Sequence, residues 1–125
     1  MKRLACCLLL AIAACAYAAF EPPRDAPVWC SGHVTGAPSP DGKPGMHITW
    51  TAYTSTESQQ AVAKRYLRTL DPKQHSREGE CDLWRDPPDE PKKVLEVCPI
   101  SENGPWSGCK DRPARARTVI MISSR

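Results

Sequence analysis

The sequence predicts a small α+β domain of two layers: a mainly antiparallel sheet of four to five strands, one helix and two disulfides, in the order β-α-β-β-β. Three observations support this fold class: several short strand-like segments, one amphipathic helical segment, and four cysteines outside the apolar N-terminus. The 125 residues suffice for one domain. One helical stripe can cover one face of a sheet, which gives a two-layer domain.

The first half of the predicted domain contains one clear strand and one weaker strand. Residues 46–54, MHITWTAYT, alternate between two faces and are rich in β-branched and aromatic residues, as strands are. Residues 28–34 are compatible with a short strand ahead of it. The segment 35–45 between them is dense in proline and glycine and is therefore expected to be a loop.

Residues 57–70 form the predicted helix, with Ser55 or Thr56 as its N-cap. The helical spacing places one apolar stripe on a single face and the basic side chains opposite it. The stripe consists of Val62, Ala63, Tyr66 and Leu70. Asp71-Pro72 ends the helix because a proline disfavours helical backbone in the residue before it.

The second half is predicted to contain strands at residues 80–85, 92–100 and 117–124, the first two forming a hairpin. The last of them is the most continuously apolar segment after the N-terminus, so it is expected in the centre of the sheet. The remaining segments, including 71–79, are expected to be loops.

The N-terminus has the pattern of a secretory signal peptide: Lys2 and Arg3, then an uncharged run over residues 4–14, then small residues. This run is too short to span a bilayer, which needs about 20 residues. Residues 15–27 are proline-rich and are expected to form an extended tether, followed by a single domain over residues 28–125.

Two cleavage sites compete. Ile12-Ala13-Ala14-Cys15 is similar to the bacterial lipobox, in which the cysteine sulfur is alkylated by a diacylglyceryl group; the signal would then be 1–14 and Cys15 the lipidated first residue. Ala16-Tyr17-Ala18 fits the A-x-A rule, with a signal of 1–18 and a soluble product. We favour the lipoprotein, and the lack of Asp after Cys15 favours the outer membrane; a soluble periplasmic or secreted protein is the alternative.

Charge gives no indication of nucleic-acid binding. The chain has 17 basic and 14 acidic residues, but removal of Lys2 and Arg3 leaves 15 basic residues and a net charge of +1. A basic cluster near the C-terminus is expected to be a solvated edge. It comprises Lys110, Arg112, Arg115, Arg117 and Arg125.

Four of the seven cysteines lie beyond the signal and its end: Cys30, Cys81, Cys98 and Cys109. An even number in a small exported domain predicts two disulfides. Three pairings are possible, and the sequence spacing favours Cys98–Cys109 as a local bridge, which leaves Cys30–Cys81. The cysteines and histidines show no metal-ligand spacing, so no metal and no cofactor are expected.

No sequence motif of a known catalytic site is present, and no catalytic residue is assigned. His33 and His47 are expected to be surface imidazoles, and the acidic segment 86–90 is expected to be an exposed turn. The alternative to a non-enzymatic protein is a small secreted hydrolase that uses one of these two histidines with a carboxylate.

The tryptophans offer two interpretations. Trp29, Trp84 and Trp106 each lie within three residues of a cysteine, where aromatic rings commonly cover a disulfide. Trp106 also lies in a Gly/Pro-rich loop, where it could be a recognition anchor. The sequence therefore predicts an exported envelope protein with a binding or structural role, for example as an inhibitor, and an envelope protein or glycan as partner.

Overall fold

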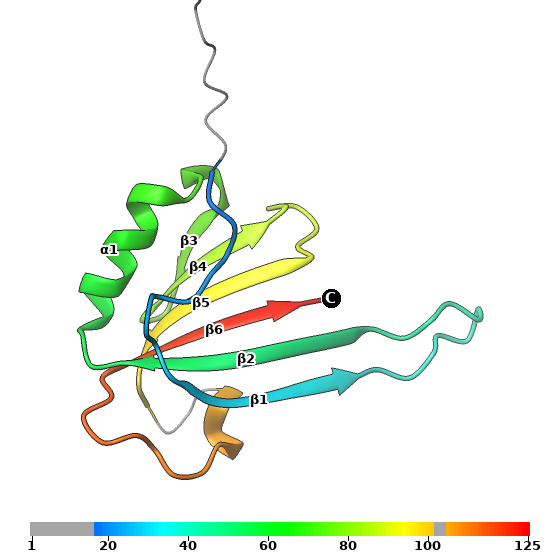
Figure 1. Ribbon diagram of the computed structural model, residues 1–125. Helices are drawn as coiled ribbons and strands as arrows, with labels where there is room; N and C mark the ends of the chain where they lie inside the picture. Colours follow the sequence, from blue (N-terminus) through cyan, green and yellow to red (C-terminus); the bar gives the residue numbers. More distant parts are fainter. Residues whose placement is uncertain (1–16, 102–104) are drawn as a thin grey trace, which may run out of the picture.

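The computed structural model describes residues 17–101 and 105–125 of the chain. In this part of the chain six strands form one antiparallel sheet in the order β1-β2-β6-β5-β4-β3, with a single α-helix packed on one face (Figure 1). The elements are β1 Val28–Thr35, β2 His47–Ser55, α1 Gln59–Thr69, the 3-10 turn η1 Pro72–Gln74, β3 His75–Glu78, β4 Cys81–Asp86, β5 Lys93–Pro99, the 3-10 turn η2 Pro105–Gly108 and β6 Thr118–Ser124.

The small sheet-rich architecture, the single helix and the two disulfides are confirmed, but the strand count is six rather than four to five. The segment 28–34 does form a strand, and residues 71–79, expected to be a loop, contain β3. β6 pairs with β2 on one side and with β5 on the other, so its predicted central position is confirmed. No helix in the described part of the chain is long and apolar enough to cross a membrane.

The helix begins later than the sequence predicted. Ser58, not Ser55 or Thr56, is the N-cap, and its Oγ accepts a hydrogen bond from the backbone N–H of Ala61 at 3.2 Å. Ser55 has another role, because its Oγ accepts from the backbone N–H of Glu57 at 3.1 Å. The predicted stripe is correct: the side chains on it face the sheet, where they meet Trp84, Leu95 and Ile120.

The opposite face of the sheet has a second apolar cluster, which the two-layer prediction did not include. Val119, Met121 and Ala52 point to this face and are covered by the segment between β5 and β6 together with both disulfides. Trp106 on η2 packs into this cluster. A loop and two crosslinks thus cover the face that the helix leaves open.

The disulfide pairing differs from the predicted one. Cys30 is bonded to Cys109, and Cys81 to Cys98. The β4–β5 register places Cys81 opposite Cys98, with their Cα atoms 4.4 Å apart. The β5–β6 segment folds back toward β1, where Trp29 Nε1 donates to the carbonyl of Lys110 at 2.9 Å, and this brings Cys109 to Cys30.

The proline-rich N-terminal segment lies against the domain from Ala18 onward instead of hanging free as a tether. The backbone N–H of Ala18 donates to the carbonyl of Thr69. The Tyr66 hydroxyl donates to the carbonyl of Glu21 at 2.6 Å, and Phe20 packs on the core under the helix. Residues 18–27 are therefore part of the folded domain, while the signal peptide and Cys15 lie outside the described residues.

Candidate functional site

Trp106 is not available as a recognition anchor. Only 3% of its surface is exposed, and its indole N–H donates to the carbonyl of Ser101 at 2.9 Å. It packs in the same cluster as Cys98 and Cys109, which matches the alternative that the tryptophans cover the disulfides. The recognition role suggested by the Gly/Pro-rich loop is wrong because the loop folds inward over the sheet.

The two histidines considered for catalysis lie together but away from any carboxylate partner among the described contacts. His33 on β1 and His47 on β2 are both exposed, and their ring centroids are 6.1 Å apart. Among the described residues, the one hydrogen bond to either ring joins His47 Nδ1 and the Thr35 hydroxyl, which lie 3.1 Å apart. The acidic turn, with Asp86, Asp89 and Glu90, is exposed as predicted.

A histidine–carboxylate pair does occur, at a position that the sequence did not indicate. His75 Nε2 lies 2.8 Å from Asp82 Oδ1, and the other oxygen of this buried carboxylate accepts from Gln59 Nε2 at 2.6 Å. The three residues come from β3, β4 and the first turn of α1. Their contacts therefore join the edge strand to the sheet and to the helix.

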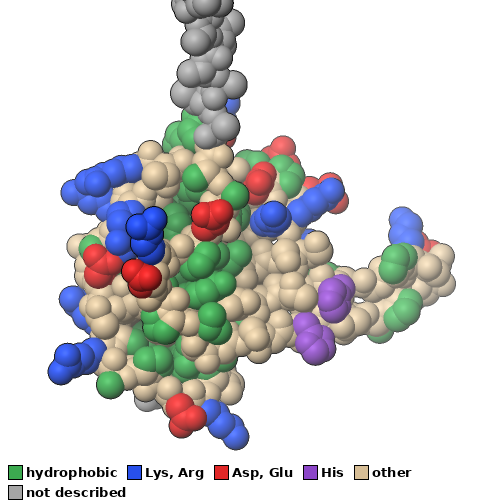
Figure 2. Space-filling view, viewed as in Figure 1, with side chains coloured by type: hydrophobic (Ala, Val, Ile, Leu, Met, Phe, Trp, Pro, Cys, Tyr) green, Lys and Arg blue, Asp and Glu red, His purple; other side chains and the backbone are tan. Residues whose placement is uncertain are grey.

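The hairpin of β1 and β2 projects beyond the rest of the sheet (Figure 1). β6 ends opposite Thr49, so His47 and Ile48 pair only with β1. β1 is an edge strand of eight residues with no charged side chain and no proline. Charge on this arm is confined to its tip, as Figure 2 shows.

The register identifies the backbone groups that β1 leaves unpaired. The N–H of Gly36 donates to the carbonyl of Met46, so this is a hydrogen-bonded pair. Hydrogen-bonded and non-hydrogen-bonded pairs alternate along an antiparallel ladder. Consequently the N–H and C=O groups of Ser31, His33 and Thr35 point away from β2, toward the open edge.

One face of this arm is apolar and open. Val34 is 55% exposed and Met46 49% exposed, and Ile48 and Trp50 lie beside them on the same face, half buried. The Trp50 ring lies over Gly32, where an added Cβ would stand 2.7 Å from a ring carbon. Glycine at this position therefore lets the indole lie flat on the edge strand.

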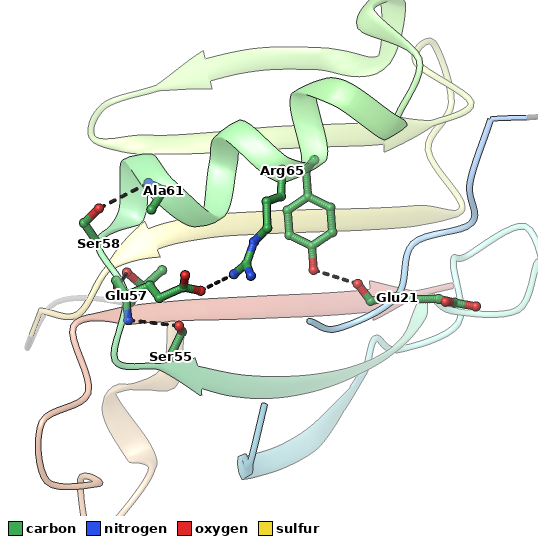
Figure 3. Close-up of polar contacts among 8 residues, drawn as sticks. Glu21, Ser55, Glu57, Ser58, Ala61 and Arg65 are labelled. Atoms are coloured by element: carbon green, nitrogen blue, oxygen red, sulfur yellow. Dashed lines mark hydrogen bonds and ion pairs between the residues drawn. The ribbon is translucent and has the colours of Figure 1, made fainter. Parts of the chain in front are cut away.

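A cavity of about 340 Å³ lies at the opposite end of β2. Its walls come from the N-terminal segment 23–27, from residues 54–57 at the end of β2, and from Pro113, Ala114 and Ala116 in the loop before β6. Arg65 reaches into it from α1 and forms an ion pair with Glu57 (Figure 3). None of the residues named as site candidates from the sequence lines this cavity.

Burial raises the pKa values of two side chains, Glu96 and Tyr66. Desolvation raises the pKa of Glu96 on β5, and the nearby carboxylate of Glu78 raises it further, against the opposing effect of Arg85. Desolvation also raises the pKa of Tyr66, so its hydroxyl stays protonated and donates to the carbonyl of Glu21. Neither group lines the cavity or the projecting arm.

The exposed basic residues of the C-terminal cluster, Lys110 to Arg125, remain solvated, as the sequence predicted. No protein-family model, no curated protein and no solved structure matches the chain.

Proposed function

We propose that this protein is an exported envelope protein, anchored as a lipoprotein through Cys15, that binds a polypeptide partner along the open edge of β1 and catalyses no reaction. The observation that carries the proposal is the uncharged, eight-residue edge strand on a projecting hairpin. Edge strands in natural proteins are normally protected by charge, proline or shortness, because an open edge can accept another strand.

The other edge of the same sheet has this protection. β3 has only four residues, and two of them are the charged Arg77 and Glu78. β1 has a register irregularity at Val28–Cys30, near its beginning, but its outer half is regular and exposed. Because the β3 edge is protected, the open β1 edge does not reflect a sheet that lacks edge protection altogether. The contrast between the two edges supports a binding role for β1.

The chemistry of the arm indicates what such a partner would look like. An added strand would pair with the outward N–H and C=O groups of Ser31, His33 and Thr35. Its alternate side chains would lie beside Val34 and Met46, so they should be apolar on that face. The Cys30–Cys109 bond holds the base of β1 in place, which lowers the entropic cost of binding.

One proline substitution with a matched alanine control tests this proposal. His33→Pro removes an outward N–H without breaking the β1–β2 ladder, and proline is tolerated where an edge N–H faces solvent. His33→Ala keeps the N–H. With a photo-crosslinker at Thr35 in the exported protein, we expect the adduct with a partner polypeptide to form in His33→Ala and to be lost in His33→Pro.

Equal loss in both variants would assign binding to the imidazole instead of the edge, and unchanged crosslinking in His33→Pro would refute strand addition. Chemical unfolding of both variants checks that the fold is intact.

Export and lipidation have a separate test. The two disulfides support an oxidising compartment. Because the domain begins at Ala18, a lipid on Cys15 would hold it within about 10 Å of the bilayer, the reach of three extended residues. We expect the intact mass of the mature protein to correspond to Cys15–Arg125 with added acyl groups. A mass that corresponds to Ala19–Arg125 without acyl groups would refute lipidation while leaving strand binding untouched.

A further inference from the structure

The cavity at the end of β2 combines opposite charges in equal number. Arg24 and Arg65 supply the positive charges on its lining, and Asp25 and Glu57 the negative ones. The remaining lining is made of proline, alanine, serine and threonine residues. Arg65 and Glu57 form an ion pair with each other, so a ligand of one charge that opened this pair would leave the other member uncompensated, whereas a ligand with both charges can bind both members.

Glu57 is held in position by its backbone. Its N–H donates to Ser55 Oγ at 3.1 Å, and its carbonyl accepts from the hydroxyl of the buried Thr118 at 2.7 Å. Figure 3 shows its side chain directed toward Arg65 of the helix. The backbone of Glu57 is therefore fixed by the fold and its carboxylate is held on Arg65 before any ligand arrives, and such preorganisation favours binding.

Two similar turns contribute residues to the lining of the cavity. In each, an alanine N–H donates to the carbonyl of a proline three residues earlier: Ala26 to Pro23, and Ala116 to Pro113. The third residue of each turn has a positive φ, 64° at Asp25 and 65° at Arg115. This conformation is strained for a residue with a side chain, and strain of this kind is concentrated at functional sites.

We propose that this cavity binds a small zwitterion, a free amino acid or a short peptide, with its carboxylate on Arg24 and Arg65 and its ammonium on Asp25 and Glu57. The volume of about 340 Å³ is at the lower end of the range of small-molecule sites, which suits a ligand of this size. This site is distinct from the β1 edge and does not depend on strand binding there.

Three dipeptide probes with different charges test the proposal. L-alanyl-L-alanine carries both charges, its N-acetyl form only the carboxylate, and its amide only the ammonium; L-alanine tests the shorter zwitterion. Amide chemical shifts of the ¹⁵N-labelled mature protein report binding site by site. We expect the dipeptide to shift the resonances of Ala26, Thr56 and Ala114 and to bind at least about tenfold more tightly than either capped form.

Two variants test whether dipeptide binding depends on the charges of Glu57 and Arg65. Glu57→Gln and Arg65→Gln should each weaken dipeptide binding at least about tenfold, whereas Lys64→Gln, a neighbouring charge that does not line the cavity, should leave it unchanged.

Equal binding of the N-acetyl dipeptide would overturn the proposal in favour of a plain carboxylate site. No shift of the cavity resonances with L-alanine or the dipeptide at about 10 mM would overturn it altogether. Unfolding curves of the variants show whether a loss of binding reflects a loss of fold.

Discussion

Replacing Cys30 and Cys109 together with alanine removes the crosslink between β1 and the loop that precedes β6. The two cysteines are 79 residues apart in the chain, whereas Cys81 and Cys98 are 17 apart. If crosslinks act by restricting the unfolded chain, these separations correspond to about 4.5 and about 3 kcal/mol. The long-range bond should therefore stabilise the domain by about 1.4 kcal/mol more than the cross-strand bond.

Urea unfolding of the wild type and of the two double-alanine variants measures this difference. The slope of the unfolding free energy against urea concentration is fitted separately for each protein. A larger loss of stability in the Cys81/Cys98 variant would refute the chain-entropy reasoning. The pairing itself has an independent check. In the single variant Cys30→Ala, alkylation and peptide mapping should find the free thiol at Cys109, and a free thiol at Cys81 would refute the pairing.

Four further predictions concern single residues. Trp106→Ala should lower the free energy of unfolding by about 3–5 kcal/mol, because it removes a buried ring; an exposed anchor would leave it unchanged. Ser58→Ala should cost about 1 kcal/mol through loss of the N-cap, seen as a lower urea midpoint. Arg115→Gly should raise the free energy of unfolding by up to about 1 kcal/mol, measured by thermal unfolding, because glycine adopts a positive φ without strain. Glu96→Gln should stabilise the protein at neutral pH. Because the pKa of Glu96 is raised in the folded protein, the wild type loses stability as the pH rises through that pKa. Unfolding measured at neutral and at acid pH should therefore show that the variant is more stable than the wild type only at neutral pH.

The helix and most of the strands could be predicted from the sequence because their signals are local. Period-two alternation in residues 46–54 and the apolar run near the C-terminus reflect which face of each strand is buried. The helix stripe follows in the same way from its 3.6-residue spacing. These segments were correct to within one or two residues at their ends.

β3 and the histidine–carboxylate pair left no such signal. The sequence HSRE at residues 75–78 does not alternate apolar and polar residues, since an edge strand has few buried positions. It is a strand because β4 offers it a ladder and because Asp82 accepts a hydrogen bond from His75. Both partners lie in the hairpin with β4, and Asp82 is only seven residues after His75, but neither the ladder nor this hydrogen bond requires an alternation of apolar and polar residues.

The N-terminal segment shows a further limit of prediction from the sequence. Its prolines predicted an extended tether, but composition does not say whether such a segment stays free or lies on the domain. The packing of Phe20 on the core and the hydrogen bond from the Tyr66 hydroxyl to the carbonyl of Glu21 decide this. The residues that follow, 23–27, line one part of the cavity.

The sequence by itself determined the types of most elements, the central strand and the presence of two disulfides, because periodicity and cysteine number are properties of the chain. Only the tertiary structure decided which cysteines pair, that Trp106 is buried, that β1 is an open edge and that four charges meet around one cavity. Each of these depends on strand register and on where a loop folds back, and both are set by contacts between residues far apart in the sequence.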